Sequence, residues 1–434
     1  MKGEGSYLAH LSDHASTCLP NSLYTPLHMP ASILIIRTSS LGDVVYASAV
    51  LHDIRRALPD AQIDWVAEEA FTSAPQLAGA RRVIPFALRR WRRRWYDPES
   101  WRELAAFRRA LRETRYDIVI DLNEQVKSAL IARAAFGERH GFNRASIREP
   151  LACSLYQVTH AVPRTLHFVE RCRRLAAAAL NYLPEGPPRW QWTLEKTGSS
   201  NALLTPPETP YVVLLHATSR DDKLWPEDRW HRLIQACRER RLRVLLPWGN
   251  AEEHARSERL AAGHDNARVP PKASLPELGA LLKQARWVAG VDTGLTHWSA
   301  ALGTPTVAIF TATSPRQLGI GIQGAHAVDL GEVGAPPEVD AVLTTASAVS
   351  AQSPAHFTRS LRGRGCPEGA GEGDGRPPLQ GEGEDGVLVY PPPSASPPQG
   401  ERGAERDASS QERLRLNQKS VGALTNASPE QEGE

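Results

Sequence analysis

From Ser32 onward, apolar runs alternate with amphipathic stretches. The run SILIIR at 32–37 is followed by a short polar loop and then by apolar residues at helical spacing from Val44 to Ile54. A buried strand, a loop and a helix in this order are typical of the start of a βαβ unit. Helical patterns separate three more predicted strands, at 62–67, 81–86 and 117–122. This half of the chain therefore predicts a parallel sheet with helices on both faces.

The same alternation starts again after residues 183–210, which are rich in Pro, Gly, Ser and Thr and which we interpret as a linker. Pro226, and Ser274 with Glu277 three residues later, are typical of helix starts. Further strands are predicted at 211–216, 243–248, 287–292 and 304–310. The fold class expected is therefore α/β, with two doubly wound domains at 29–182 and 211–346.

The two ends of the chain differ from this pattern. All 11 Trp lie between Trp65 and Trp298, whereas 13 of the 32 Gly and 10 of the 34 Pro lie in the last 84 residues. Such a composition is typical of disorder. We predict a low-complexity disordered tail at 347–434 and an N-terminal extension, also disordered, at 1–28.

Composition and charge exclude several classes of protein. The net charge of +2 is too small to suggest a general nucleic-acid binder. No apolar run reaches the roughly 18 residues of a membrane span. The five cysteines are too sparse for a disulfide scaffold, and the first residues do not resemble a signal peptide. A cytoplasmic protein is therefore expected.

Three loops follow predicted strands at the edge where an open parallel sheet binds its ligands. In the loop 38–43, Asp43 is either a first-turn acid favoured by the helix dipole or a general base. The loop 216–226 is either a solvated cap or a phosphate site with Lys223 as its point charge. The loop 291–297 places two backbone amides and His297 near one another, where they could bind a ligand. Alternatively, His297 is a buried histidine whose hydrogen bonds are all made within the protein.

Five arginines lie among aromatic residues at 88–96, in the sequence LRRWRRRWY. Such a stretch suits an RNA patch, a membrane-surface contact or a pocket for an anionic substrate. The nearly balanced charge argues against nucleic acid and favours an acidic substrate at a membrane. The pattern G-x-G-x-x-G at 319–324 lacks a surrounding βαβ unit, and the loop 38–43 has a single glycine, so a dinucleotide-dependent oxidoreductase is disfavoured.

Taken together, these loops resemble the lipopolysaccharide heptosyltransferases of glycosyltransferase family 9, and within that family the heptosyltransferase I group. The likeness spans about Ile33 to Ala312. Its motifs are RTSSLGDVV, WVAEEAF, IPFALRRWRRRW, DLNEQVKSAL, REPLA, LLHATSRDDKLWPEDRW, LPWGNAEE and VDTGLTHWSAALGTPT.

The resemblance implies a GT-B fold, in which two Rossmann-like domains face each other across a cleft, with the acceptor on the first and the donor on the second. The implied reaction is inverting transfer of L-glycero-D-manno-heptose from ADP-heptose to the first Kdo of Kdo2-lipid A, with Asp43 as general base. The implied donor-binding residues are Thr218, Ser219, Lys223, Glu253, Ala273, Asp292, Thr293, Gly294 and His297. The implied acceptor-binding residues are Arg89, Arg90, Arg92, Arg93 and Arg148.

The same resemblance implies a monomer without metal or other cofactor, peripheral on the cytoplasmic face of the inner membrane. Two alternatives stay open: transfer to a heptose, as in heptosyltransferase II, or an inactive relic that binds a sugar nucleotide. The chain departs from the family at Asn123-Glu124, where a Gln-Gly pair is usual. The likeness also fades after about Ile320, where members of the family normally finish with helices that pack back on the domains, and a low-complexity tail follows.

Overall fold

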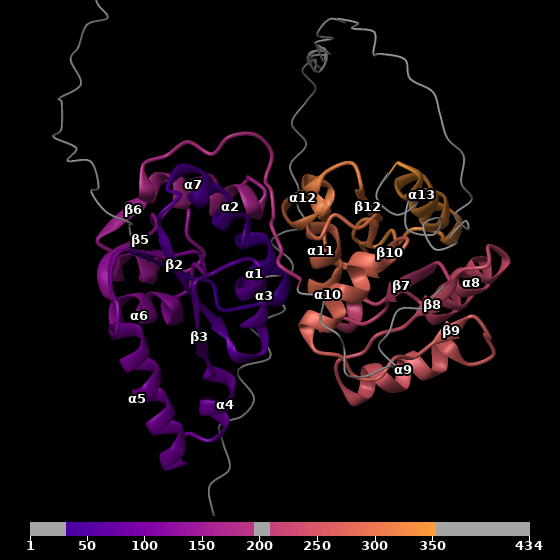
Figure 1. The fold of residues 1–434 in the computed structure, drawn as a ribbon, viewed down its shortest axis with the longest axis horizontal. Helices are drawn as coiled ribbons and strands as arrows, with labels where there is room; N and C mark the ends of the chain where they lie inside the picture. The colour runs from indigo at the N-terminus through magenta and orange to yellow at the C-terminus, as the bar shows by residue number, and fades with distance from the viewer. Residues whose placement is uncertain (1–31, 195–208, 353–434) are drawn as a thin grey trace, which may run out of the picture. The chain divides into compact units, whose positions relative to one another are not determined.

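The computed structural model of the chain describes residues 32–194 and 209–352. Its first part is a six-stranded parallel sheet with the strand order β3-β2-β1-β4-β5-β6 (Figure 1). The strands are β1 (Ser32–Ile36), β2 (Gln62–Glu68), β3 (Arg82–Phe86), β4 (Arg115–Asp121), β5 (Phe136–Phe142) and β6 (Val158–His160). The helices are α1 (Leu41–Ala47), α2 (Ala49–Ala57), α3 (Ser73–Leu77), α4 (Leu88–Arg93), α5 (Pro98–Arg112), α6 (Val126–Ala134) and α7 (Phe168–Leu180).

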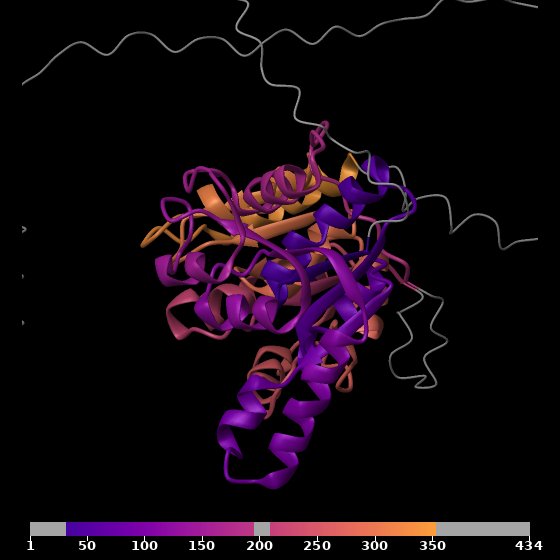
Figure 2. The same cartoon turned by 90° about the vertical axis from the view of Figure 1, so that its left-hand side faces the viewer.

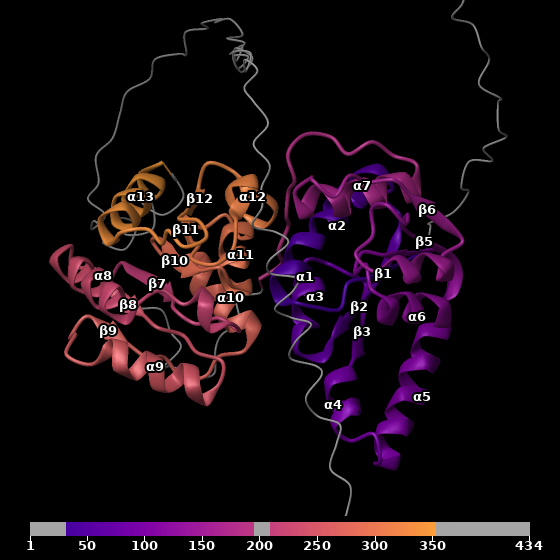
Figure 3. The same ribbon diagram turned by 180° about the vertical axis from the view of Figure 1, so that it is seen from behind.

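The second part is another six-stranded parallel sheet, with the order β12-β11-β10-β7-β8-β9, which Figure 3 shows from behind. Its strands are β7 (Tyr211–Leu215), β8 (Arg243–Leu245), β9 (Ala267–Arg268), β10 (Val288–Val291), β11 (Thr306–Ile309) and β12 (Ala327–Leu330). Its helices are α8 (Glu227–Glu239), α9 (Ala251–Ala261), α10 (Leu275–Gln284), α11 (Gly294–Ala301), α12 (Pro315–Leu318) and α13 (Val339–Ala351).

Both sheets have the doubly wound order of a Rossmann fold, because each is built outward from its first strand in two directions. The direction changes between β1 and β4 in one sheet and between β7 and β10 in the other. Ligands of such sheets bind at the carboxyl ends of the strands beside this point. The predicted α/β class with two doubly wound sheets is confirmed.

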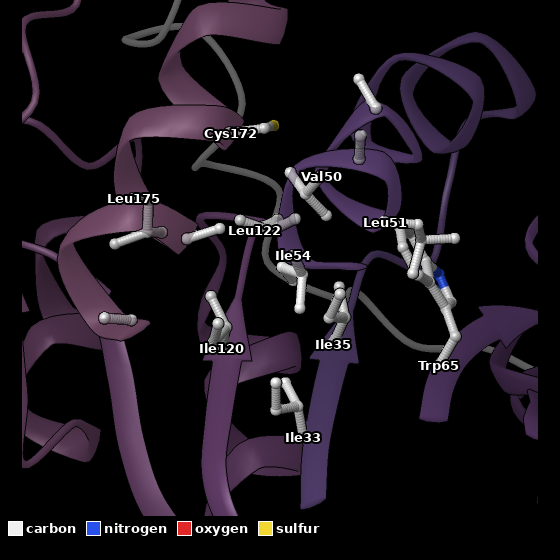
Figure 4. Packing of buried hydrophobic residues seen from close by; sticks show 14 of the residues in the cluster. Ile33, Ile35, Val50, Leu51, Ile54, Trp65, Ile120, Leu122, Cys172 and Leu175 are labelled. Carbon is white, nitrogen blue, oxygen red and sulfur yellow. The ribbon is translucent and has the colours of Figure 1, made fainter. Parts of the chain in front are cut away.

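The central strand β1 shows why these runs form buried strands. Ile33 and Ile35 pack into one hydrophobic cluster, while Leu34 and Ile36 pack into another on the opposite face of the sheet. Figure 4 shows Ile33 and Ile35 among side chains of β4 and of the covering helices. Because successive side chains of a strand point to opposite faces, a continuous apolar run fits a sheet that is covered on both sides.

The C-terminal end of the described region differs from expectation. The predicted tail begins at 347, but α13 continues to Ala351 and packs five apolar residues against the second sheet: Val339, Val342, Leu343, Ala346 and Val349. The second domain therefore extends beyond its predicted end at 346. The rest of the predicted tail, from 353 onward, and the predicted extension at 1–28 lie outside the described residues.

The predicted linker is described at 183–194 and 209–210, where it contains no helix or strand. Its indole groups are nevertheless anchored. Trp190 donates from Nε1 to the carbonyl oxygen of Val45 at 2.8 Å, and Trp192 donates to that of Ala301 at 3.0 Å. This part of the linker is therefore packed. Within 32–194 and 209–352, no helix combines the length and apolarity that a bilayer crossing requires.

Candidate active site

Asp43 lies in the first turn of α1, directly after the carboxyl end of β1. Its Oδ2 accepts hydrogen bonds from the backbone N–H of Ser40 at 2.8 Å and from the Ser40 hydroxyl at 3.0 Å. The same oxygen is 2.9 Å from a guanidinium nitrogen of Arg37. Among the described residues, no hydrogen bond or ion pair involves Oδ1, and the side chain keeps 27% of its exposure. One carboxylate oxygen is thus fixed and the other is free.

The environment of Asp43 keeps its carboxyl ionised. Burial acts to raise the pKa, but the charge of Arg37 and the hydrogen bonds from Ser40 together act more strongly, so the pKa lies below its ordinary value. Arg37 is itself held firmly. It donates to the carbonyl oxygen of Leu122 at 2.7 Å, and its guanidinium lies 4.6 Å from the centre of the Phe168 ring. No local sequence pattern indicates this role of Arg37.

The loops 216–226 and 291–297 meet at Asp292, which is 5% exposed. Its Oδ2 accepts from Lys223 Nζ at 2.6 Å and from the Thr313 hydroxyl at 2.7 Å, and its Oδ1 lies 3.0 Å from Nε2 of His297. Burial acts to raise the pKa of Asp292, but these partners hold it well below its usual range. The Thr218 hydroxyl donates to the backbone carbonyl oxygen of Asp292 at 3.4 Å.

Four of the other predicted donor-binding residues are positioned as follows. Thr293 is the N-cap of α11 and Gly294 its first residue, so the first amides of that helix lie beside Asp292. Ser219 is exposed in the loop that precedes Lys223. Glu253 lies in the first turn of α9, where it accepts from the Gly249 amide at 2.7 Å.

Ala273 lies between β9 and α10 and is partly buried against an apolar cluster. No side-chain hydrogen bond among the described residues joins Glu253 or Ala273 to Asp292. The structure therefore brings Thr218, Lys223, Asp292, Thr293, Gly294 and His297 together, and it places Glu253 and Ala273 after the neighbouring strands β8 and β9.

The helix that carries Asp43 touches the helix that follows Asp292. A Cβ built on Gly42 would lie 2.7 Å from Cδ2 of His297, and one on Gly294 would lie 2.8 Å from the amide nitrogen of Gly42. Only glycine allows this approach of α1 and α11. The hydroxyl of Tyr46, one turn after Asp43, is 2.8 Å from Nδ1 of His297.

Tyr46 is fully buried, and burial raises its pKa well above the ordinary value, so the phenol keeps its proton. The hydroxyl also reaches the carbonyl oxygens of Leu318 and Gly319, at 2.7 and 2.9 Å. Tyr46, His297 and Asp292 thereby form a continuous buried chain of hydrogen bonds from α1 to Lys223. Sequence reasoning missed Tyr46 because its partner lies 251 residues away.

The predicted acceptor-binding arginines do not form one cluster of free charges. Arg89 pairs with Glu68 at 3.1 Å, and Arg90 is taken up by Glu69 at 3.0 Å and by Glu103 at 2.6 Å. Arg92 and Arg93 are exposed on α4, and Arg148 is exposed between β5 and the short 3₁₀ helix at Pro150–Leu155. Arg90 would have to leave the carboxylates of Glu69 and Glu103 before its guanidinium could bind a ligand.

The departure at Asn123-Glu124 has a structural account. Glu124 has a φ of 62°, a conformation that favours glycine. The Glu124 carboxylate compensates by a buried two-point contact with Arg171, at 2.7 and 3.0 Å. Asn123 accepts from the Thr38 amide at 3.0 Å and so ties the loop to the end of β1.

Comparisons with known proteins agree with this geometry. The profile of glycosyltransferase family 9 (heptosyltransferase) matches residues 104–341. Lipopolysaccharide heptosyltransferase 1 of Salmonella typhimurium is 42% identical over 66% of this chain and 90% of its own length. The protein of the same name from Pseudomonas aeruginosa is 41% identical over 68% of this chain and 81% of its own.

Among solved structures, the E. coli heptosyltransferase WaaC with ADP superposes with a TM-score of 0.67 at 37% identity, covering 73% of this chain and 99% of that one. The same enzyme with ADP-2-deoxy-2-fluoro heptose gives a TM-score of 0.61 at 38% identity, covering 74% and 98%.

Two Rossmann-like sheets, with a carboxylate loop on one and a lysine-bearing loop on the other, together with these structural relatives, define an α/β glycosyltransferase of the GT-B fold. The chain belongs to glycosyltransferase family 9, the heptosyltransferases.

Proposed function

We propose that this enzyme transfers L-glycero-D-manno-heptose from ADP-heptose to the first Kdo of Kdo2-lipid A, in the synthesis of the lipopolysaccharide inner core. Two similarities support the proposal. The heptosyltransferase 1 proteins of Salmonella typhimurium and Pseudomonas aeruginosa are 42% and 41% identical, whereas the E. coli heptosyltransferase II structure is 21% identical and speaks only for the fold. The related WaaC structures hold ADP or a fluorinated ADP-heptose.

The donor diphosphate would bind where Lys223 meets the start of α11. Lys223 would exchange Asp292 for the phosphates, and the amides of Thr293 and Gly294 would hold a phosphate at the positive end of the helix. Thr218, Ser219, Ala273 and His297 would line the rest of the donor site, and Glu253 would bind the ribose hydroxyls. Neither loop contains an Asp-x-Asp pair, so Lys223 and the amides, without a metal ion, would offset the charge of departing ADP.

The observation that carries the mechanism is the asymmetry of Asp43, whose Oδ2 is held by Arg37 and Ser40 while Oδ1 is free. Oδ1 would take the proton of the acceptor hydroxyl as that oxygen bonds to C1 of the heptose. The bond from C1 to the ADP oxygen would break in the same step, and its electron pair would leave with ADP. Attack from the face opposite ADP inverts the configuration at C1.

The acceptor would be held by basic side chains from α4 and from the loop after β5. Arg89, Arg92, Arg93 and Arg148 would bind its carboxylates and phosphates, and Arg90 would join them on leaving Glu69 or Glu103. The enzyme would act as a monomer, peripheral on the cytoplasmic face of the inner membrane, where its acceptor lies.

The proposal is tested by measuring ADP release from ADP-heptose with Kdo2-lipid A as acceptor. Asp43→Asn is expected to lower the rate by about 10²–10⁴ while ADP binding remains. Asp60→Asn, which changes an exposed acid in the turn between α2 and β2, is the matched control and keeps the wild-type rate.

Three results would count against the proposal. Normal turnover by Asp43→Asn would remove the general base. Release only with an already heptosylated acceptor would point to the heptosyltransferase II reaction. Tight ADP binding without release for any acceptor would indicate a sugar-nucleotide-binding relic.

A further inference from the structure

Three large aromatic side chains are exposed where α4 turns into α5. Trp95, Tyr96 and Trp101, which we call the aromatic tip, are 68%, 72% and 61% exposed. Figure 2 shows the two helices, in purple, extending away from the rest of the sheet and its covering helices. Single exposed apolar residues are ordinary on a protein surface, but three such rings within seven residues form a patch that calls for a partner.

The aromatic tip is held in its exposed position. At the base of the hairpin, the Trp91 ring packs 5.7 Å from that of Phe107. At the tip, the indole N–H of Trp101 donates to the carbonyl oxygen of Trp95 at 2.8 Å, and the Trp95 ring lies edge-to-face with Tyr96 at 6.2 Å. This hydrogen bond and the edge-to-face contact hold the three side chains in their exposed positions.

The charges around the aromatic tip are predominantly positive. Residues 88–103 contain six arginines and three acids, a net charge of +3. Arg92, Arg93 and Arg94 are exposed, and none of them takes part in a side-chain hydrogen bond or ion pair within the described part of the chain. Unpaired guanidinium groups bind phosphates, and exposed indole and phenol rings favour a boundary between a polar and an apolar layer. The surface of a phospholipid bilayer offers both.

We propose that the aromatic tip and Arg92–Arg94 dock this enzyme on an anionic lipid bilayer. The rings lie at the level of the lipid headgroups, where amphipathic aromatic side chains prefer to be, and the guanidinium groups bind lipid phosphates. Arg92 and Arg93, which the proposed function also assigns to the acceptor, belong to both the docking surface and the acceptor site, whereas the aromatic tip and Arg94 contact only the bilayer. The docking surface rests on the proposed function only for the idea that the acceptor is itself a membrane lipid.

The binding test uses the full chain and vesicles without any acceptor. Co-sedimentation is measured with phosphatidylcholine alone and with phosphatidylcholine and phosphatidylglycerol at 7:3. We expect binding to the anionic vesicles that weakens with salt, because the Debye length falls from about 10 Å at 0.1 M to about 3 Å at 1 M. Trp95→Ala/Tyr96→Ala/Trp101→Ala is expected to lower the partition coefficient about tenfold.

Exchanging Arg92, Arg93 and Arg94 for Gln is expected to weaken binding to anionic vesicles by about fivefold for each charge. The control is Leu183→Ser/Val333→Ser, which changes exposed apolar residues outside the hairpin, 85% and 64% exposed, and leaves binding unchanged. No wild-type binding to anionic vesicles, or equal binding by the wild type and the triple alanine variant, would overturn the proposal.

A second readout separates docking from the chemistry. The triple alanine variant is expected to turn over an acyl-free, water-soluble Kdo acceptor at the wild-type rate, while its KM for acceptor embedded in vesicles rises. Loss of turnover on the soluble acceptor would place the aromatic tip in the acceptor site and refute a docking role. If neither acceptor is turned over by the wild type but vesicle binding behaves as expected, the proposed function fails and the docking surface stands.

Discussion

The ion pair between Lys223 and Asp292 gives a prediction whose size follows from the structure. Lys223→Met keeps most of the apolar stem and removes the charge that lies 2.6 Å from the Asp292 carboxylate. That carboxylate is 5% exposed, so water replaces the lost ammonium poorly. Removing one partner of a buried pair costs about 3–5 kcal/mol. His297 and Thr313 still bond the carboxylate, so we expect a loss of about 2 kcal/mol in the free energy of unfolding.

The pH dependence of this loss has a definite sign. The folded pKa of Asp292 lies well below its unfolded value, so its stabilising contribution is complete above the unfolded pKa of about 3.9 and declines as the pH falls below it. Removing Lys223 raises the folded pKa. The difference in stability between wild type and variant is therefore largest at neutral pH and narrows in acid.

Urea unfolding at pH 7 and at decreasing pH measures these differences. Arg220→Gln is the matched control, because it breaks an exposed ion pair with Asp222 in the same loop, and such pairs contribute little to stability. In Lys223→Met/Asp292→Asn the uncompensated charge is gone, so most of the loss is recovered, although ADP binding stays weak.

Two results would show that the ion pair does not stabilise the fold. One is a Lys223→Met variant as stable as Arg220→Gln. The other is a double variant whose loss in the free energy of unfolding equals the sum of the losses of the two single variants.

Three other groups give predictions of their own. Arg37→Met raises the pKa of Asp43, so the acid limb of the kcat/KM profile shifts to higher pH; an unshifted limb would contradict the assignment of Arg37 as a positioning residue. Tyr46→Phe leaves His297 Nδ1 without its 2.8 Å partner and is expected to cost about 1–3 kcal/mol in stability, measured by urea unfolding; an unchanged midpoint would mean that the bond contributes nothing. Burial lowers the pKa of His216 to about 4, so the free energy of unfolding of the wild type is expected to fall by up to about 3 kcal/mol from pH 6.5 to 4. His216→Gln is expected to lack this fall. An equal pH dependence of stability in both proteins would refute the assignment to His216.

Local patterns in the sequence determined much of the fold. The run at 32–37 predicted a buried strand, which is β1, and Ser274 with Glu277 three residues on marked the start of α10. The loops after β1, β7 and β10 were found because each follows a recognisable strand and carries polar residues. Periodicity and capping act over a few residues, so a sequence reports them directly.

Elements with weaker patterns were missed. The strand β5 has the sequence FGERHGF, whose charged and glycine residues hide its apolar character, and β12 is only four residues long. The helix α13 has apolar residues at helical spacing, but we placed the end of the folded pattern at Ala346, five residues before the helix ends. Such elements form because a neighbouring sheet offers a surface to pair with or cover, and their own sequences do not contain that surface.

The candidate site divides in the same way. The sequence determined that Asp43, Lys223 and Asp292 follow strands of parallel sheets and therefore lie at ligand-binding edges. Only the tertiary structure decided that Arg37 leaves one oxygen of Asp43 free and that Tyr46 meets His297 across 251 residues. Contacts between distant residues depend on how whole helices and strands pack against one another. Many side chains are compatible with a given helix or strand, but few fit the particular side chain that packs against them.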